Sequence, residues 1–275
     1  MTRFLQTLRA APYTARFGMA VILLVAVIAI LAPVIAPYGE TAVVGEQYEP
    51  WSSRFLLGTD NLGRDMFSRL VFGTRNTVGL ALLTTAIAFT VGSLLGIVAA
   101  VTGGMTDRLL SRIIDVIMAI PSLILALMLL TIVGASIASM VLVIALIYVA
   151  PVFRLARASA QSVVVMDYIQ AARLRGEGLA WLVLKEVLPN IASTLVAEFG
   201  LRFCFVFLFI AALSFLGLGI QPPTADWGSM LKENATLISF GDITPLLPAA
   251  AIAMLTVSIN FVVDWMLHRS SGLKD

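Results

Sequence analysis

Residues 76–101 read NTVGLALLTTAIAFTVGSLLGIVAAV and contain no charged side chain. A helix needs about 20 mostly apolar residues to cross the hydrocarbon core of a bilayer, so this stretch is long enough to span a membrane. The whole chain has the same character, because 60% of its 275 residues are hydrophobic and 12% are charged. That charged share is about half of the roughly 25% found in soluble domains. The sequence therefore predicts an integral membrane protein.

Six segments qualify as membrane-spanning helices by length and composition. They are residues 17–36, 77–101, 113–133, 137–157, 189–219 and 244–267. Pro121 and Pro151 lie within two of them, where neighbouring helices can satisfy the carbonyl groups that a proline kink frees. A basic start and an apolar run would also suit a cleaved signal peptide at residues 1–36, but no A-x-A site follows the run. The predicted fold class is an all-α integral membrane protein with six transmembrane helices, the first of them retained.

The distribution of Lys and Arg predicts the orientation, because these residues are enriched on the cytoplasmic side. With a cytoplasmic N-terminus, twelve of the 18 Lys and Arg residues lie inside and five outside, while Arg202 lies within a span. Both termini are therefore expected in the cytoplasm. The predicted segments are a cytoplasmic N-terminus (1–16), a first span (17–36), an outer segment with an interfacial helix (37–76), a five-span core with a cytoplasmic loop at 158–188 (77–267) and a cytoplasmic tail (268–275).

Several kinds of chemistry are excluded by residue counts. One cysteine, Cys204, allows no internal disulfide and no cysteine-rich metal cluster, and one histidine, His268, excludes an H-E-x-x-H site. None of the three lysines follows a glycine, so the G-x-x-x-x-G-K-[ST] phosphate loop is absent. A net charge of +2 implies no nucleic-acid partner. We expect no catalytic residue, no metal and no cofactor in this chain.

One charged segment, DYIQAARLRGEGLAWLVLKEVLPN at residues 167–190, interrupts the apolar pattern. Asp167 can cap a first helix, with Gln170 reaching back as in a capping box. Ala171 and Ala172 favour helix and would let a partner approach the backbone closely. Gly176 suits the left-handed position after the helix. A second helical piece follows, and Pro189 suits the first turn of the next span.

The spacing of Asp167, Ala171-Ala172, Gly176 and Leu188-Pro189 resembles the coupling loop of ABC importer permeases. The acidic residue departs from the simple Glu-Ala-Ala form, and DYIQAARLRG is similar to the peptide-importer branch. Residues 56–75 (LLGTDNLGRDMFSRLVFGTR), 115–127 (DVIMAIPSLILAL) and 214–231 (SFLGLGIQPPTADWGSML) resemble signatures of dipeptide, oligopeptide and nickel importer permeases. The likeness runs from the first span to about residue 267 and fits the second, C-type permease of the pair.

This resemblance implies a type I ABC importer permease fold in a bacterial inner (plasma) membrane, in contact with membrane lipid. It implies three kinds of partner. These are a second permease subunit that forms a heterodimer with this chain, two ATPase subunits that bind ATP and Mg, and a periplasmic substrate-binding protein. In the family, the coupling helix inserts into a groove on the ATPase subunit, which implies that role here for Asp167, Ala171, Ala172, Arg173, Gly176, Leu188 and Pro189. The alternative for residues 158–188 is an ordinary solvated loop.

Two further groups of polar residues are candidate sites. Glu198 and Arg202 lie four residues apart on the fifth predicted span, where opposite charges can pair. They could form a structural ion pair near the cytoplasmic boundary or belong to a gate or path. The outer segments contribute Asp60, Arg64, Asp65, Asp226 and Trp227, which could dock the binding protein or line the mouth of the path. Their alternative role is structural, with Trp227 as an interfacial anchor and residues 66–71 as a helix on the membrane surface.

The function that we expect is a permease subunit that forms half of the translocation path for dipeptides or oligopeptides. Nickel complexes or oligosaccharides are alternative cargoes within the same family. An ion-coupled secondary carrier is a rival of another class, with Glu198 and either Asp115 or Asp264 as a proton relay. The helical loop at 158–188 counts against the carrier, because a carrier has no motor to dock.

Overall fold

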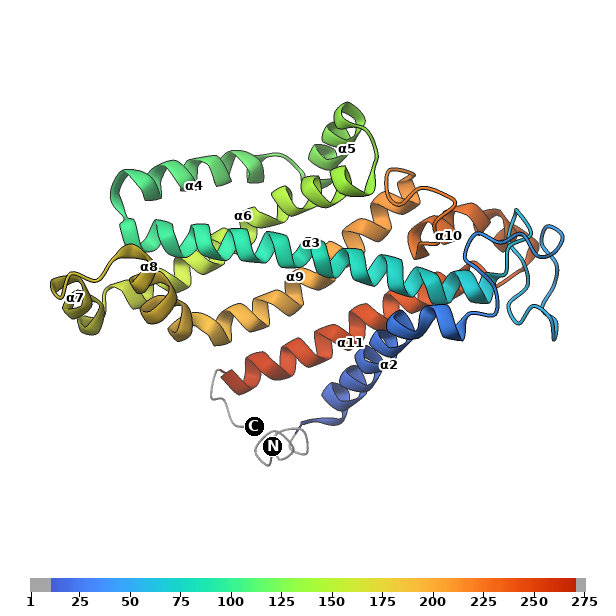
Figure 1. The fold of residues 1–275 in the computed structure, drawn as a ribbon, viewed down its shortest axis with the longest axis horizontal. Coiled ribbons are helices and arrows are strands. Elements are labelled where there is room, and N and C mark those ends of the chain that lie inside the picture. Colours follow the sequence, from blue (N-terminus) through green and yellow to red (C-terminus); the bar gives the residue numbers. More distant parts are fainter. Residues whose placement is uncertain (1–10, 271–275) are drawn as a thin grey trace. The chain divides into compact units, whose positions relative to one another are not determined.

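The computed structural model describes residues 11–270, and every element of more than one residue in that range is helical (Figure 1). The helices are α2 (Tyr13–Ile35), α3 (Met66–Thr102), α4 (Gly104–Ala119), α5 (Ser122–Val133), α6 (Ile137–Val164), α7 (Asp167–Leu174), α8 (Leu179–Trp181), α9 (Leu188–Leu216), α10 (Trp227–Asn234) and α11 (Leu246–Ser270). A π-helical turn (Leu182–Val187) joins α8 to α9, and a 3-10 turn (Ala235–Phe240) follows α10.

The chain forms two compact units. The first contains the described residues up to Leu82, with Ala135–Met140 and Cys204–Trp265. The second contains Leu83–Gly134, Val141–Phe203 and the described residues from Met266 onward. Both draw on segments that are distant in sequence, because helices α3, α6, α9 and α11 each contribute to both units.

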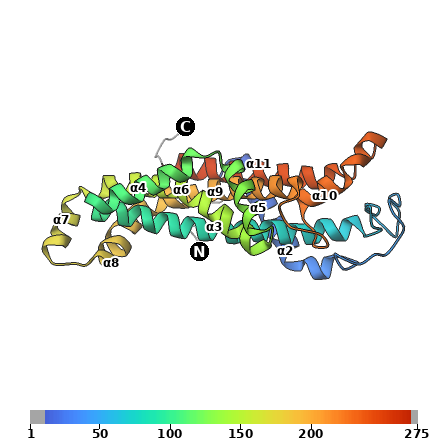
Figure 2. The same cartoon turned by 90° about the horizontal axis from the view of Figure 1, so that it is seen from above.

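Within residues 11–270, five helices are long and apolar enough to cross a membrane. They are α2, α3, α6, the continuous helix Leu179–Leu216 and α11 (Figures 1 and 2). The pair α4 and α5 makes a sixth candidate if it is counted as one broken span. The predicted multi-span helical class is therefore confirmed, with five or six candidate spans.

The third predicted span, 113–133, is not one kinked helix. Helix α4 ends at Ala119 and α5 begins at Ser122, with an angle of 89° between them. Pro121 lies between them as the N-cap of α5, with a ψ of 125°. Ile120 is also extended, with a ψ of 132°, as expected for a residue before proline. Two consecutive extended residues break the helix rather than bend it.

The interfacial helix expected before the second span is also absent as a separate element. Helix α3 begins at Met66 and runs without interruption for 37 residues. Met66 and Val71, which were expected to face the membrane surface, are buried. Asp65 starts the helix by accepting hydrogen bonds from the amide and hydroxyl groups of Ser68, at 2.8 and 2.6 Å. Local pattern alone could not distinguish burial against protein from burial in lipid.

In the second unit, α3 packs closely on α6 through two glycines. A Cβ atom at Gly92 would lie 2.8 Å from the carbonyl oxygen of Val149, and one at Gly96 would lie 2.6 Å from that of Phe153. These distances are shorter than real Cβ atoms tolerate. Small residues four apart allow two membrane helices to approach at backbone distance, so this pair forms the centre of the unit.

Pro189 does not open a new helix, as the sequence suggested. It lies in the second position of α9, directly after the π-helical turn, within a helix that is continuous from Leu179 to Leu216. The amide of Leu188 bonds to the carbonyl of Val183, five residues back. Proline lacks an amide hydrogen and its ring clashes with the carbonyl four residues earlier. Widening of the preceding turn accommodates that ring.

Helix α9 ends at Leu216, well before Pro222-Pro223. Gly217 has a φ of +88°. Its amide bonds to the carbonyl of Ser214, and the amide of Leu218 bonds to that of Leu213. This is a Schellman motif, so a glycine rather than the prolines terminates the helix.

Candidate coupling helix and buried polar clusters

Helix α7 and the turn after it form the candidate coupling segment. Asp167 is the first helical residue and Met166 is the N-cap, with no side-chain cap, so the predicted capping box is wrong. Asp167 still places a negative charge in the first turn, where it is favourable. The predicted end is confirmed, because Gly176 has a φ of +81°.

Hydrogen bonds at this C-terminus complete a Schellman motif. The amide of Gly176 bonds to the carbonyl of Arg173 at 3.0 Å, and that of Glu177 to the carbonyl of Ala172 at 3.2 Å. No heavy atom lies within 4 Å of the position that a Cβ at Gly176 would take. Glycine is therefore required by the left-handed backbone and not by crowding.

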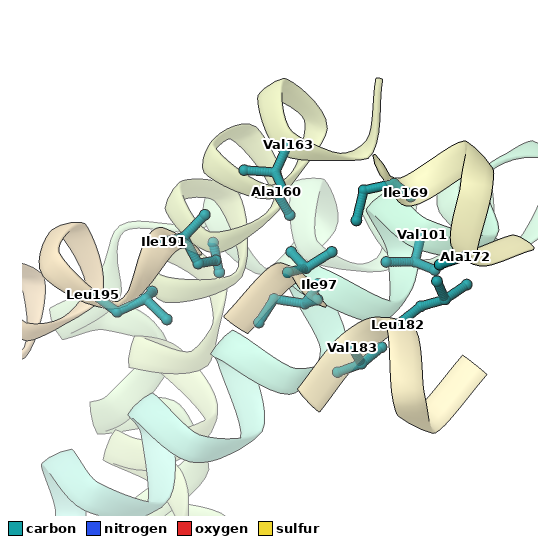
Figure 3. Packing of buried hydrophobic residues seen from close by; sticks show 12 residues of the cluster. Ile97, Val101, Ala160, Val163, Ile169, Ala172, Leu182, Val183, Ile191 and Leu195 are labelled. Carbon is teal, nitrogen blue, oxygen red and sulfur yellow. The ribbon is translucent and has the colours of Figure 1, made fainter. Parts of the chain in front are cut away.

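One face of α7 is buried in the chain's own core. Ile169 and Ala172 are both fully buried, and Figure 3 shows them pointing toward Val101 of α3 and Leu182 of the π-helical turn. The cluster consists of Ile97, Val101, Ala156, Ala160, Val163, Ile169, Ala172, Leu182, Val183, Val187, Ile191 and Leu195. Ala172 is thus not available for close approach by a partner, contrary to the sequence interpretation.

The opposite face of α7 is exposed. Tyr168 is 42% exposed and Leu174 is 90% exposed, and Ala171 lies between them on the same side. These three residues are spaced by three along the helix, which places them on one face. A leucine that is almost fully exposed on a short, well-anchored helix is an apolar contact point. Among the predicted coupling residues, Asp167, Ala171, Arg173 and Gly176 are exposed, as is Pro189, whereas Leu188 is partly buried.

Arg173 connects α7 to the end of α3. Its Nη2 donates a hydrogen bond of 2.8 Å to the carbonyl oxygen of Val101, which lies one residue before the last residue of α3. The final carbonyl groups of a helix have no partner within that helix. Arg173 therefore both satisfies such a group and fixes α7 to a membrane-spanning helix.

Glu198 and Arg202 form the ion pair that their spacing predicted. Arg202 donates from both Nε and Nη2 to Oε1 of Glu198, with an Nε–Oε1 distance of 2.9 Å. The Arg202 guanidinium also lies 5.8 Å from the ring centroid of Tyr148 in α6, within the range of a cation–π contact. Both charged side chains are mostly buried within the second unit. This geometry fits the structural alternative.

Two ion pairs between α4 and α6 were not anticipated from the sequence. Arg157 donates from Nε and Nη2 to the two carboxylate oxygens of Asp107, at 2.5 and 2.6 Å. Arg154 bonds to Asp115 at 2.6 Å. The Arg154–Asp115 pair is exposed, so it contributes little to stability, whereas the two-point Arg157–Asp107 contact fixes orientation. Their partners lie 50 and 39 residues apart, too far for a local pattern to reveal.

The outer polar residues of the first unit form a buried network. Asp60 accepts hydrogen bonds from the Nε of Arg64 at 2.7 Å and from Arg69, and both arginines also contact Glu233 of α10 at 3.0 Å. Burial alone would raise the pKa of Asp60. The amides of Arg64 and Leu62 and the two guanidinium groups outweigh burial and hold that pKa below its usual value.

Asp226 and Trp227 belong to a second buried cluster of the same unit. Asp226 caps α10 by accepting from the amide of Ser229 at 2.9 Å, and it accepts from the hydroxyl of Thr77 at 2.8 Å. Burial raises the pKa of Asp226 despite these hydrogen bonds. The indole Nε1 of Trp227 donates to the carbonyl of Leu70 at 3.0 Å, and its ring lies edge-on to Phe207.

These five outer residues therefore lie in the interior and not on a docking surface. Asp60, Arg64, Asp65, Asp226 and Trp227 are each at most 3% exposed, and Trp227 is not an interfacial anchor. Sequence analysis missed Arg69 and Glu233, which complete the first network. Arg69 falls nine residues after Asp60, and Glu233 is 164 residues from Arg69, so no local spacing indicates either contact.

Family models match two parts of the chain. The model described as "Binding-protein-dependent transport system inner membrane component" matches residues 92–271. The model described as the N-terminal TM domain of oligopeptide transport permease C matches residues 13–52. The second match includes α2, and the first includes α7 and the turn after it.

Curated relatives match over most of their length. The di/tripeptide transport system permease protein DppC of Pseudomonas aeruginosa is 36% identical over 269 residues, covering 94% of this chain and 85% of the relative. The dipeptide transport system permease protein DppC of Haemophilus influenzae is 32% identical, covering 95% and 88%. The peptide transport system permease protein SapC of Escherichia coli O6:H1 is 36% identical, covering 87% and 83%. This chain therefore belongs to the family of inner membrane components of binding-protein-dependent transport systems.

Proposed function

We propose that this chain is a permease subunit of an ATP-driven importer and forms half of the translocation path for dipeptides or oligopeptides. The observation that carries the proposal is helix α7, which is fixed to α3 on one face and exposes Leu174 on the other. Such a helix can transmit a push from a separate motor to a membrane-spanning helix. Family membership supports the same role, because the family depends on a binding protein.

The proposed complex contains a second permease subunit, two ATPase subunits that hold ATP and Mg, and a periplasmic substrate-binding protein. This chain would contribute six spans, with α4 and α5 as one broken span, and both termini would lie in the cytoplasm. The bias of Lys and Arg supports that orientation. ATP hydrolysis is assigned to the partner subunits, so the purified chain should not hydrolyse nucleotide by itself.

The coupling face in this proposal is Tyr168, Ala171 and Leu174, with Asp167, Arg173 and Gly176 positioning the helix. Ala172 and Leu188 contribute by packing within the chain. The ATPase subunits can shift the conformation of the permease only if their ATP-bound form binds one state of the permease better than the other. Fixed contacts from α7 to α3 would pass that preference into the membrane.

Peptides are the proposed cargo because the three relatives above are named as dipeptide, di/tripeptide and peptide permeases. The secondary carrier that relies on Glu198 is less well supported, since that carboxylate is engaged by Arg202. The same names do not favour nickel complexes or oligosaccharides as cargo.

The test uses the complex reconstituted in vesicles with its binding protein and a labelled dipeptide. The parental complex should take up peptide only with ATP. Leu174→Ser should reduce uptake and release ATPase subunits during purification, because it removes the exposed apolar contact without altering the core. Leu174→Met keeps an apolar side chain and should retain uptake. Equal uptake by the Ser and Met variants would contradict the coupling role of this face.

A further inference from the structure

The second unit contains a cavity of about 280 Å³ at the break between α4 and α5. Residues on both sides of the break line it together with one stretch of α6. They are Ile117, Met118, Ile120, Pro121, Ser122, Ile147, Tyr148 and Pro151. Ligand pockets run from about 300 to 1,000 Å³, so this cavity suits one part of a ligand, such as a single large side chain.

Irregular backbone at this point cannot face lipid. The last carbonyl groups of α4 and the first amides of α5 have no partner within their own helices. Lipid-exposed backbone of this kind does not occur in the hydrocarbon region, where it is tolerated only inside protein or along a water-filled cavity. The side of the break that holds the cavity is therefore a candidate for the aqueous path.

The break also lies at a suitable depth. Asp115, which pairs with Arg154, is the last charged residue before it and lies six positions before Pro121. At 1.5 Å per residue that is about 9 Å along the helix axis, about a third of a hydrocarbon core about 30 Å thick. Discontinuous helices near the midplane are common positions for substrate sites in transporters.

The wall of the cavity combines apolar and polar groups. Ile117, Ile120 and Ile147 supply aliphatic surface, while Ser122 and Tyr148 supply hydroxyl groups. The Arg202 guanidinium lies 5.8 Å from the centroid of the Tyr148 ring, and Glu198 in turn orients that guanidinium. An acyl chain would need none of these hydroxyl groups. A peptide carries apolar side chains next to amide groups and would use both kinds of wall.

We propose that this cavity receives an apolar side chain of the peptide during translocation, with Tyr148 as a specificity-determining residue positioned by the Glu198–Arg202 pair. The inference rests on the proposed function, since it requires peptide to pass this chain. It predicts that the permease discriminates among peptides that its binding protein delivers equally well.

The test makes the same substitution, Ile to Trp, at one residue that lines the cavity and at one nearby residue that does not. Ile120 lines the cavity and is 39% exposed, whereas Ile124 is not among the lining residues and is 52% exposed. Uptake is measured for two dipeptides that saturate the binding protein and differ only in Phe against Ala at one position. Ile120→Trp should lower the Phe/Ala uptake ratio by about ten-fold, the lower end of what a changed apolar pocket achieves. Ile124→Trp should leave the ratio unchanged.

A milder pair of variants covers the case in which Trp prevents assembly. In a Cys204→Ala background, Ile120→Cys should react with a small thiol reagent more slowly during turnover with the Phe peptide than with the Ala peptide, and Ile124→Cys should not distinguish them. An unchanged ratio in Ile120→Trp, together with equal reaction of Ile120→Cys, would overturn the proposal. Equal loss of both peptides in Ile120→Trp would overturn it too. Failure of the parental complex to import any peptide would instead refute the proposed function.

Discussion

The guanidinium group of Arg173 donates a hydrogen bond to the main-chain carbonyl of Val101, 72 residues earlier in the chain. This contact joins a short, mostly exposed helix to the end of a 37-residue helix. A side chain that bonds to a backbone carbonyl responds to the position of the helix and not to the identity of the residue there. Displacement of α7 would therefore act directly on α3.

Replacing Arg173 with Met should uncouple transport while leaving the complex assembled. Methionine keeps the length of the side chain but cannot donate to Val101, so α7 loses its polar link to α3. We expect ATP hydrolysis to persist while uptake per ATP hydrolysed falls several-fold. Arg175→Met is the matched control, because Arg175 is 57% exposed and its nearest carboxylate oxygen, from Glu177, is 3.7 Å away. Similar uptake-to-hydrolysis ratios in the two variants would argue against the link.

Gly176 and Gly178 offer a test of backbone conformation. Neither would crowd a Cβ atom, but only Gly176 has a positive φ. A left-handed conformation costs a residue with a side chain roughly 1–2 kcal/mol, and a β-branched residue resists it most. Gly176→Val should therefore lower uptake strongly, Gly176→Asn should be tolerated better, and Gly178→Ala should be nearly neutral. Uptake assays at equal membrane abundance would decide, and a defect in Gly178→Ala as large as that in Gly176→Val would contradict the explanation.

Much of the fold was predictable because a helix that crosses the bilayer must be long and mostly apolar. The uncharged run at 76–101 gave the body of α3, and the glycine at 176 indicated where α7 ends. Both depend on composition or on a single backbone preference. The error at Ala172 has another origin. Which side of a short helix faces the protein depends on segments that pack against it, here the end of α3 and the turn after α8.

The buried polar networks could not have been found from the sequence alone. Asp60 and Arg64 are four residues apart and suggested a local cluster, yet Glu233 completes it from a distant helix. Trp227 resembled an interfacial anchor because an amphipathic ring suits a membrane boundary. Its actual position depends on Gly73, where a Cβ atom would lie 2.8 Å from the indole ring. A small residue that leaves room for a large one elsewhere has no signature in either segment.

The proposed orientation can be tested with single cysteines in a Cys204→Ala background. Gln47→Cys and Ser239→Cys occupy exposed positions in outer segments, and Gln170→Cys occupies an exposed position on α7. A reagent that cannot cross the membrane should label the first two in sealed cells and label Gln170→Cys only after the cells are opened. Gly45 is a poorer choice, because a Cβ there would lie 2.9 Å from the ring of Phe55. Labelling of Gln170→Cys in sealed cells would refute the topology.

Asp226 should make stability depend on pH in a direction set by its burial. Its pKa in the folded protein is raised, chiefly by burial, above the value of about 3.9 expected in the unfolded chain. The protonated carboxyl group is thus the form that the fold favours. Its contribution is fully present below the unfolded pKa and is lost as the pH rises through the folded pKa. At neutral pH, above the unfolded pKa, the group therefore contributes unfavourably to folding, because the unfolded chain carries the carboxylate at a lower cost.

Asp226→Asn should therefore unfold at the same temperature as the parent or higher at pH 7, with the difference shrinking as the pH falls toward 4. The amide can still accept from the Ser229 amide and can donate to the Thr77 hydroxyl. Asp226→Ala removes the helix cap and should lower stability by about 0.5–2 kcal/mol. Thermal unfolding of the purified complex across this pH range gives both comparisons. If Asp226→Asn were destabilised as much as Asp226→Ala at pH 7, the ionised carboxylate would be stabilising, and the raised pKa would be wrong.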